Sequence, residues 1–545
     1  MGENPKNYNL LVEQWIPVLY RDGRWQRVGI RKALRDAGEI REVRDSSPLV
    51  TFGIYRLLIA VLKWLGTSAQ KQDWNRLLGE SALPVGLLGQ LDQPENEKVF
   101  DLRNPAHPFF QDAKEFADLP ALVTAADERK LTKTEREKRK LKTVAYLATE
   151  IPTKTYKAHF WHANDETTQL CTACCVCGLL TLPPFCTGVG QGNETSINNV
   201  PPVYWLVHSE RLLDTLLLNL PDGESEGDAP CWVRSQAANH IGALEGMTWE
   251  ARRVAIYPNE VAVGRCSRCG EPATATNPLV HWIIFAKRAT KKADDAWLAT
   301  WIDPHVAGTF EKKKDRTRFV GQAADVAPGA WCRRVQSLFT PSEDNRTRQS
   351  PNMAALASRS CVPGRCEAVA YMLRSKKADF EYWQEERWPI SPALVKEPSL
   401  CEPIISAAKQ AGLIIRFLSE EWPECLWRLR YSDRNPNRNG MKSLRKGCAA
   451  AAIRSAVDEF DQRLESWFRT QMGAIADGGS PDVRADLPTV CREAGHSAVA
   501  SIVASLSAAR SPLDRARIEQ SATELIEGAV RKMERAIGKG GRKKT

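Results

Sequence analysis

Residues 171–196 read CTACCVCGLLTLPPFCTGVGQGNETS, and this stretch combines two features that decide how the chain is interpreted. It opens with a C-x-x-C pair, Cys171 and Cys174, which is a spacing typical of metal-binding turns. It closes on a run with glycines at positions 188, 190 and 192. The partners of the cysteine pair and the purpose of the glycine run therefore have to be found in the rest of the chain.

A second C-x-x-C pair, Cys266 and Cys269 in GRCSRCGE, lies far downstream, with 91 residues between Cys174 and Cys266. Tetrahedral zinc takes four soft ligands, and two such pairs supply them because each tight turn brings two sulfurs to one ion. We therefore predict a zinc site of Cys171, Cys174, Cys266 and Cys269 that joins two distant segments. Four thiolates leave no open position for water, so this zinc would be structural.

Neighbouring cysteines leave an alternative open. Cys174 and Cys177 also form a C-x-x-C pair, and Cys175 and Cys186 lie close by. Unligated cysteines are often buried as small apolar residues, so an inert set is the competing interpretation. The chain has 15 cysteines, and in a reducing compartment closely spaced ones favour metal ligation over disulfides.

The glycine run favours close approach to a ligand. Glycine adopts backbone conformations that other residues avoid, and it lets the main chain come near another molecule. Next to DNA, such a loop can lie in the minor groove, which reports mainly A·T against G·C pairs, or against phosphates. The alternative is a turn that closes the preceding helix. The G-x-G-x-x-G spacing of a dinucleotide site is absent.

The length and composition are those of a folded protein with more than one domain. The chain has 545 residues, of which 43% are hydrophobic and 26% charged. We find no run of about 18 apolar residues, so we expect no membrane span. The start, MGENPKNYNLLVEQWIPV, lacks the pattern of a secretion signal, so we expect a cytoplasmic protein.

Positive charge is concentrated in three runs. The formal net charge is +10, and Lys and Arg gather in residues 129–142, 311–318 and 428–446. Such runs favour a polyanionic partner, because neutralised phosphates release counterions. Solvated loops and helix faces are the alternative for any single run. Three runs in one basic chain favour nucleic acid.

The pattern of hydrophobic residues changes near position 396. Residues 1–395 mix short β-rich runs, such as 204–208 and 281–286, with helical stretches such as 50–66. From 396 to 545, apolar residues recur at three- and four-residue steps in four long segments separated by Ser, Asn, Gly and Pro. We predict an α+β protein with a large mixed α/β domain, 1–395, that carries the zinc site and the glycine loop. A C-terminal four-helix bundle, 396–545, would follow it.

Enzyme signatures are absent from the sequence. It contains no phosphate-binding G-x-x-x-x-G-K-[ST] loop, no H-E-x-x-H helix and no G-x-S-x-G nucleophile turn. No H-x-E precedes a P-C-x-x-C, as a zinc deaminase requires. We therefore predict that the chain is not an enzyme and has no catalytic residues, although dispersed carboxylates could form a nuclease site.

Five ordered motifs resemble one family, the large subunit of type I-E Cascade (CasA/Cse), which belongs to a CRISPR RNA-guided surveillance complex. The motifs are YNLLVEQWIPVLYRDGR (8–24), HPFFQ (107–111), HFWHANDETTQLCTAC (159–174) followed by a helix and GVGQGN (188–193), VGRCSRCG (263–270) and the C-terminal bundle. Each motif is short, but their order and spacing along nearly the whole chain are specific.

The resemblance implies a binding role in the cytoplasm, without catalysis. The subunit would read the protospacer-adjacent motif on duplex DNA, promote strand opening and R-loop formation, hold the displaced strand and dock a helicase-nuclease. Its partners would be other Cascade subunits, the 5′ handle of the guide RNA and target DNA.

The resemblance also implies three groups of nucleic-acid-binding residues. The loop at Phe160, with Trp161 and Asn164, would contact the RNA handle. A glycine loop would enter the minor groove, and its residues are Gly188, Gly190, Gln191, Gly192 and Asn193. A single lysine, which we call the lysine finger, would enter the same groove, and its candidates are Lys287, Lys291 and Lys292. A wedge hairpin in RSKKADF would place Lys376, Lys377 and Ala378 where the family often has Gln, and this departure bears on the wedge and on the preferred motif.

Two other functions stay open on the sequence alone. One is a zinc-dependent enzyme that cleaves or modifies DNA, which would require metal-dependent activity in the purified chain. The other is a structural ribonucleoprotein component that binds RNA without reading DNA. The simplest alternative is a basic protein whose glycine and cysteine features serve only its fold.

Overall fold

The computed structural model describes residues 7–68, 74–148, 150–151, 168–187, 195–222, 228–233, 242–257, 264–287, 301–313, 316–339, 347–358, 364–376, 379–431, 448–506 and 511–541. These residues form two compact units. The first consists of Met1–Ala324 with Ser350–Arg387, and the second of Asp325–Gln349 with Trp388–Thr545. The predicted division into domains of residues 1–395 and 396–545 stays a prediction.

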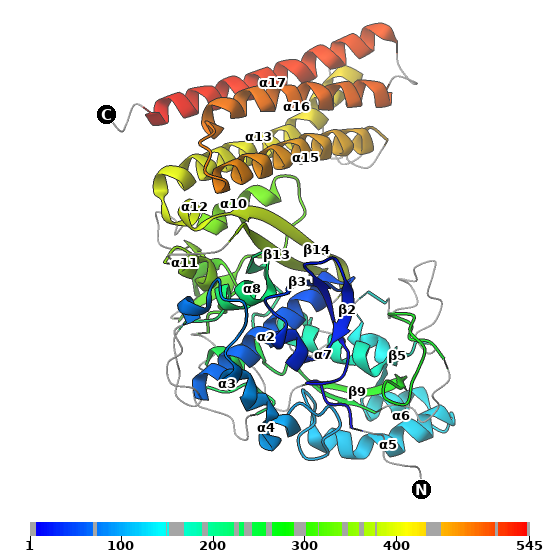
Figure 1. Cartoon of the computed structure of the whole chain (residues 1–545). Helices are drawn as coiled ribbons and strands as arrows, with labels where there is room; N and C mark the ends of the chain where they lie inside the picture. The colour runs from blue at the N-terminus through cyan, green and yellow to red at the C-terminus, as the bar shows by residue number, and fades with distance from the viewer. Residues whose placement is uncertain are drawn as a thin grey trace. The chain divides into compact units, whose positions relative to one another are not determined.

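The first unit contains small antiparallel sheets around a long central helix (Figure 1). One sheet has the order β2-β1-β3, another β14-β13-β6, a third β4-β9-β7, and β5 pairs with β8. The strands are β1 (Ile16–Tyr20), β2 (Trp25–Val28), β3 (Ile40–Val43), β4 (Leu141–Thr143), β5 (Leu170–Cys171), β6 (Tyr204–His208), β7 (Arg252–Ile256), β8 (Leu279–Val280), β9 (Trp282–Lys287), β10 (Gly308–Lys313), β11 (Arg316–Gly321), β13 (Cys366–Lys376) and β14 (Asp379–Ile390).

The helices of the first unit are mostly short. They are α1 (Ile30–Arg35), α2 (Pro48–Ser68), α3 (Val85–Leu88), α4 (Pro94–Lys98), α5 (Ala113–Asp127), α6 (Lys133–Lys138), α7 (Thr172–Phe185), α8 (Leu212–Leu218), α9 (Ala243–Met247) and α11 (Pro351–Leu356). Helix α2 contacts α7, α8 and α9, so it forms the centre of the core. Phe52 of α2 packs against the rings of Phe185 and Tyr204 with centroid distances of 5.5 and 4.7 Å.

Helix α2 corrects the expectation that no stretch is apolar and long enough to span a membrane. Its segment Pro48–Gly66 reaches a mean hydropathy of 1.6 over an 18-residue window. However, 94% of that window is buried inside the protein, as is typical of a core helix. Among the described residues it is the one helix with the length and composition of a span.

The second unit is built from helices. Four are long: α13 (Pro398–Tyr431), α15 (Cys448–Ala476), α16 (Val483–Leu506) and α17 (Pro512–Gly541). They lie side by side (Figure 1), and α16 contacts the other three, while α13 also contacts α15 and α17. The shorter α10 (Ala330–Phe339) and α12 (Pro392–Lys396) pack against α13. Helical segments are therefore present where periodicity predicts them, and the closed four-helix bundle as a domain stays a prediction.

Apolar side chains along these helices form the core of the second unit. Ile404, Ile415 and Leu418 of α13 are buried. Phe460 and Phe468 of α15 are buried as well. Within each helix these positions lie 11, 3 and 8 residues apart, close to whole turns of 3.6 residues, so each helix places an apolar stripe on one face. The predicted amphipathic pattern of this region is the physical reason for its helices.

Candidate metal centre and nucleic-acid interface

Four cysteines from two distant segments meet in the first unit. The Sγ atoms of Cys171, Cys174, Cys266 and Cys269 all lie within 4.8 Å of one another. Cys171 Sγ and Cys269 Sγ are 3.8 Å apart. A tetrahedral zinc ion with Zn–S bonds of about 2.3 Å separates its sulfurs by about 3.8 Å, so the cluster has the size of such a site. These four residues could hold a metal ion, as the sequence predicted.

The downstream pair sits in a tight turn. The backbone N–H of Gly270 donates to the Cys266 carbonyl at 2.9 Å, and the N–H of Cys266 donates to the Glu271 carbonyl, also at 2.9 Å. Gly270 has φ of +74°, a left-handed conformation that favours glycine. The turn folds Cys269 back toward Cys266, and the N–H of Cys171 donates to Cys266 Sγ at 3.3 Å.

Crowding of the four sulfurs changes their acid–base behaviour. Hydrogen bonds from the thiols of Cys171 and Cys174 lower the pKa of Cys269 below its usual value. The hydrogen bond with Cys171 raises the pKa of the Cys174 thiol well above its usual value. The four thiol groups of the cluster therefore do not lose their protons equally easily, because four thiolates this close would repel one another. A divalent cation removes that repulsion, so the donor set fits a soft metal ion.

The other cysteines of the upstream segment do not belong to this cluster. Cys175 is fully buried, and its thiol points to the Leu170 carbonyl at 3.9 Å. Cys186 Sγ lies 3.7 Å from the Thr187 carbonyl oxygen. Cys177 is buried in the apolar core, where burial raises the pKa of its thiol to about 12. The geometry thus resolves the sequence ambiguity in favour of the Cys171 and Cys174 pair.

Two arginines lie beside the cluster. Arg268 Nη1 is 3.8 Å from Cys174 Sγ, and its guanidinium also pairs with the carboxylates of Asp45 and Glu150. The Arg268 side chain is only 7% exposed, so this network is largely shielded from water. Burial opposes the charge of Arg27, but the sulfurs of Cys269 and Cys174 outweigh burial and raise the pKa of Arg27. Both cations therefore offset negative charge on the sulfurs.

Helix α7 starts at the cluster and runs through the core. Cys171 is its N-cap, and every residue from Thr172 to Phe185 except Leu182 is buried. The helix packs tightly, since a Cβ on Gly178 would lie 2.2 Å from the Leu147 carbonyl oxygen. Fixing the start of α7 therefore also fixes its end at Phe185, three residues before Gly188.

The two ends of the glycine segment are held together. The N–H of Ser196 donates to the Cys186 carbonyl at 2.8 Å. Arg252, which is buried in β7, donates from Nη2 to the Thr187 carbonyl at 3.0 Å. Cys186 also packs with Ile197 and nearby apolar residues in a small core. We call this arrangement of Cys186, Thr187, Ser196 and Arg252 the stem.

A buried ion pair supports the chain as it leaves the stem. Arg56 Nη2 on α2 donates to Asp303 Oδ2 at 2.7 Å, with the side chains 3% and 0% exposed. Asn198, two residues beyond the stem, donates to the same Asp303 oxygen at 2.9 Å. Burial works against the ionised carboxylate, but Arg56 prevails and lowers the pKa of Asp303. The pair thus connects the stem's exit to the central helix.

Most of the predicted nucleic-acid-binding residues fall outside the described part of the chain. These are Phe160, Trp161, Asn164, Gly188, Gly190, Gln191, Gly192, Asn193, Lys291, Lys292, Lys377 and Ala378. Lys287 is described, and it is the exposed last residue of β9. Lys376 ends β13 and Asp379 begins the neighbouring β14, so Lys377 and Ala378 connect two adjacent strands.

The structure brings the start of the lysine-bearing segment close to the stem. In the antiparallel pairing of β7 with β9, Lys287 lies directly opposite Arg252, and opposite residues in such a ladder have Cα atoms about 5 Å apart. Arg253 Nε also donates to the Lys287 carbonyl at 3.2 Å. The chain that carries Lys291 and Lys292 therefore departs from a point next to the residue that holds Thr187.

Sequence reasoning missed the arginines that build this region. Arg268 stands inside the second cysteine turn, where its position between two ligands was the available signal. Arg27, Arg56 and Arg252 carry no local signal, because their partners lie far away in the sequence.

The comparisons with known proteins place the chain among CRISPR-associated proteins. The family model described as CRISPR-associated protein Cse1 matches residues 9–499. The chain therefore belongs to the Cse1 family, which confirms the resemblance to the large subunit of type I-E Cascade at the level of the family. This is a family of structural subunits and not of enzymes, as the sequence predicted.

Individual relatives agree with this placement. A CasA/Cse1 protein of Thermus thermophilus is 30% identical over 279 residues, which are 47% of this chain and 50% of that relative. The chain thus spans about half the length of that curated relative in the alignment. The crystal structure of Cse1 from Acidimicrobium ferrooxidans has a TM-score of 0.71 at 18% identity, covering 98% of this chain and 100% of that one.

A chain of a solved assembly also shares the fold. It is described as a CRISPR RNA-guided surveillance complex, and it has a TM-score of 0.64 at 15% identity, covering 96% of this chain and 100% of that one. At such identities the likeness concerns the fold. The mixed α/β fold of this chain is therefore that of Cse1 structures.

Proposed function

We propose that this chain is the large subunit of a CRISPR RNA-guided surveillance complex, and that it recognises the protospacer-adjacent motif on duplex DNA. The proposal includes strand opening, R-loop formation, contact with the displaced strand and docking of a helicase-nuclease. Family membership supports it. The single observation that carries the DNA-reading part is the stem, because it fixes both ends of the glycine segment on a rigid scaffold.

The stem gives a physical basis for recognition of a DNA motif by the glycine-rich segment. A backbone that enters a DNA groove has to be positioned within a fraction of an ångström, which a long free loop does not achieve. The chain between Cys186 and Ser196 is closed by a hydrogen bond and anchored to Arg252 and Asp303 through its flanks. Glycines at 188, 190 and 192 then let the main chain approach the minor groove without Cβ atoms in the way.

A lysine finger is the second part of the proposed reader. Lys287 lies opposite Arg252, so the segment that begins there starts beside the stem. Lys287, Lys291 and Lys292 are the candidates for the residue that enters the same groove. Lysine side chains are suited to phosphates and to acceptors at the groove floor.

The proposed wedge and RNA contacts use the remaining predicted residues. Lys376, Lys377 and Ala378 lie at the junction of β13 and β14, and a hairpin tip is a suitable place for a wedge beneath the motif. Phe160, Trp161 and Asn164 belong to the segment that leads into α7. An aromatic residue in such a segment can stack on a splayed base of the guide RNA's 5′ handle.

We propose zinc as the metal of the cysteine cluster. The four sulfur donors and their spacing are those of a closed structural site, which fits zinc better than magnesium or calcium. When bound, the ion would hold Cys171 and Cys174 against Cys266 and Cys269, and so anchor the start of α7. A site of four thiolates also disfavours a zinc-dependent nuclease, since no position remains for an activated water. The cytoplasmic location stays a prediction.

The deciding experiment changes one glycine. Gly190→Asp places bulk and a negative charge next to phosphates, so we expect loss of binding to motif-bearing duplex by the assembled complex, measured by gel shift. Gly86→Asp is the matched control, because Gly86 lies exposed on α3 with open space where a Cβ would stand. If Gly190→Asp keeps the wild-type melting temperature and still binds that duplex normally, the segment is only a turn.

Five further substitutions test the remaining parts. Phe160→Ala should weaken joining to the guide-RNA complex without affecting the isolated fold, and unchanged affinity would contradict the RNA contact. Lys376→Ala and Lys377→Ala should reduce strand opening, with less effect on DNA already bubbled at the first target pairs. Lys291→Ala and Lys292→Ala should flatten the salt dependence of binding, since removing one lysine–phosphate interaction reduces the slope by about 1.

A further inference from the structure

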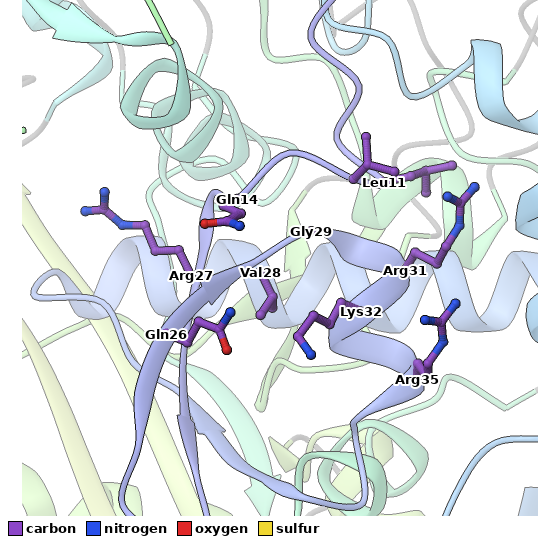
Figure 2. Close-up of a pocket in the computed structure, with 10 residues that line it drawn as sticks. Leu11, Gln14, Gln26, Arg27, Val28, Gly29, Arg31, Lys32 and Arg35 are labelled. Atoms are coloured by element: carbon purple, nitrogen blue, oxygen red, sulfur yellow. The ribbon is translucent and has the colours of Figure 1, made fainter. Parts of the chain in front are cut away.

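A hollow of about 310 Å³ lies in the first unit between the N-terminal loop, β2 and α1 (Figure 2). Its lining residues are Leu11, Val12, Gln14, Gln26, Arg27, Val28, Gly29, Arg31, Lys32 and Arg35. Four of them are cationic and none is acidic. They come from the run RDGRWQRVGIRKALR at 21–35, a basic stretch outside the three runs of positive charge named above.

Nearby acids neutralise only part of this charge. Arg31 Nε lies 2.9 Å from Asp92 Oδ1, and its Nη2 donates to the Leu91 carbonyl at 3.3 Å. Lys32 Nζ pairs with Asp36 Oδ2 at 2.7 Å. Within the described part of the chain, the side chain of Arg35 makes no ion pair or hydrogen bond. The hollow therefore keeps a net positive charge, and one of its arginines has its donors free for a ligand.

The lining also offers polar groups and a firm base. The side-chain amides of Gln14 and Gln26 make no hydrogen bond to any described residue, so they are available for a ligand. Figure 2 shows Arg31 and Arg35 on the same side of α1, with Lys32 directed toward β2. Buried Leu11 and Val28 form the apolar floor, and the first N–H groups of α1 donate to the carbonyls of Leu10 and Leu11. The donors are thus held on fixed elements.

An exposed aromatic ring stands at the start of β2, the strand that supplies Gln26, Arg27 and Val28 to the lining. Trp25 is 55% exposed, although large aromatic side chains are rarely left in water. It shares one face of β2 with Arg27, whose guanidinium carbon lies 5.7 Å from the ring centroid. An exposed indole next to cationic side chains is the combination that unpaired nucleic acids use, with bases on the ring and phosphates on the cations.

We propose that this hollow binds the phosphodiester backbone of an unpaired nucleic acid strand, with Trp25 as a stacking platform for one of its bases. Arg35, Lys32 and Arg31 contact phosphate oxygens, and the amides of Gln14 and Gln26 bond to phosphate or sugar. A free inorganic anion would use the cations but would leave Trp25 without a role. The site does not depend on the glycine segment, so either assignment can fail alone.

The test measures binding of fluorescein-labelled oligonucleotides to the purified full-length chain by fluorescence anisotropy. The probes are a 20-nucleotide dT strand, the matching rU strand and a 20-base-pair duplex, each titrated between 50 and 200 mM salt. We expect the single strands to bind in preference to the duplex. A preference for dT or for rU identifies the physiological strand as DNA or RNA, and either result supports the site.

The decisive variants remove charge and ring separately. Arg31→Ala with Arg35→Ala should weaken single-strand binding roughly tenfold and reduce the slope of log affinity against log salt by about 1.4, the value for two phosphate contacts on a single strand. Arg416→Ala with Arg463→Ala is charge-matched and lies on α13 and α15, so it should leave binding unchanged. Arg35→Ala alone loses no partner within the described chain, so it tests the site should the double variant fail to fold.

Substitutions of Trp25 distinguish base stacking from a nonspecific effect of charge, because they change the ring and leave the charge of the protein unaltered. Trp25→Ala should weaken binding of single strands about tenfold, whereas Trp25→Phe should recover much of it, since stacking needs an aromatic face. The proposal is overturned if Trp25→Ala has no effect, if the duplex loses as much as the single strands, or if the control pair weakens binding as much as the double variant. Displacement by millimolar inorganic phosphate with no effect of Trp25→Ala would identify a simple anion site instead.

Discussion

Polar contacts inside each of the two units differ in how far apart their residues lie in the sequence. In the first unit, Arg268 reaches Asp45 and Glu150 across 223 and 118 residues of sequence. Two cysteine pairs also meet there, with Cys171 lying 95 and 98 residues from Cys266 and Cys269. In the second, the polar contacts of the long helices include pairs such as Arg416–Glu420 and Arg469–Glu465, four residues apart. The proposed reading site therefore depends on polar contacts between distant residues. The long helices combine apolar stripes, local pairs and contacts between helices such as Ser497–Glu459.

This contrast indicates where a single substitution should destabilise the protein most. Buried charges and sulfurs in the first unit have no substitute partner when one member is removed, so the loss is large. Exposed pairs on a helix are solvated whether or not they form, so the loss is small. We expect the effects of substitutions to follow this contrast, from the cysteine cluster down to the surface of α13.

Removing a cysteine ligand should have the largest effect. Cys171→Ser leaves three thiolates, and metal binding at such a site is itself folding free energy. We expect zinc content to fall below half an equivalent by elemental analysis and the melting temperature to drop strongly. Cys175→Ala is the control, since Cys175 is buried nearby but lies outside the cluster. If Cys171→Ser retains full zinc and wild-type stability, the cluster is not a metal site.

Breaking the buried ion pair of the first unit should come next. Arg56→Met leaves the Asp303 carboxylate, whose side chain is 0% exposed, without its cation. Removing one member of a buried pair costs about 3–5 kcal/mol of unfolding free energy, measured by urea denaturation. The double variant Arg56→Met with Asp303→Leu should recover part of the loss, because no uncompensated charge remains. A single-variant loss below about 1 kcal/mol would contradict this account.

The two units should respond to pH in opposite directions, through His305 and Asp461. In the first unit, burial lowers the pKa of His305 to about 4 from 6.5. Between these values the unfolded chain binds a proton that the folded chain does not. Stability is therefore fully present above pH 6.5 and is lost as the pH falls toward 4, by up to about 1.4 kcal/mol per pH unit.

In the second unit, burial raises the pKa of Asp461 to about 6 from 3.8. Here the folded chain keeps its proton longer, so the contribution is fully present below pH 3.8 and is lost as the pH rises through 6. Asp461 Oδ1 accepts hydrogen bonds from Trp331 Nε1 at 2.6 Å and from the N–H of Gly329 at 3.0 Å. An asparagine at position 461 would still provide a side-chain oxygen that accepts these hydrogen bonds, but it would carry no negative charge.

Urea unfolding at pH 4.5, 5.5 and 7 checks both signs. Relative to wild type, Asp461→Asn should become more favourable as the pH rises. His305→Gln should cost most at pH 7 and progressively less toward pH 4.5, as the penalty for protonating the histidine disappears. Parallel pH profiles of wild type and both variants would show that neither group titrates differently on folding.

The smallest effect is expected on the surface of α13. Arg416 Nε lies 3.1 Å from Glu420 Oε1, with the side chains 77% and 60% exposed. Such a pair contributes about 0.2–0.5 kcal/mol to a helix, so Arg416→Ala should change the urea midpoint barely above error. A loss as large as that of Arg56→Met would remove the contrast between the two units.

Sequence patterns predicted the features whose determinants are local. The three- and four-residue repeat of apolar side chains predicted helices now seen in α13, α15, α16 and α17. The C-x-x-C spacing predicted which four cysteines meet, and the structure excludes Cys175, Cys177 and Cys186 from that group. These successes have one cause, since helix periodicity and turn chemistry are properties of a few neighbouring residues.

Features made by distant residues could not be predicted in this way. Arg252 supports Thr187 from 65 residues away, and Arg56 supports Asp303 from 247. Nothing near an arginine in sequence indicates such a partner. The apolar helix α2 was also underestimated, because Arg56 and Lys63 interrupt its hydrophobic run while both are buried. The nucleic-acid-binding residues within 188–193 stay predictions.

The hydrogen bond between Ser196 and the Cys186 carbonyl also bears on how such a protein can change over evolutionary time. Because the chain leaves and re-enters the scaffold at one point, the residues in between can be exchanged, lengthened or shortened without moving α7. Closing a longer loop is inexpensive, since doubling its length adds only about 0.6 kcal/mol. A reader of short DNA motifs built in this way can acquire a new preference by replacing one interchangeable cassette, while the inherited framework around it stays the same.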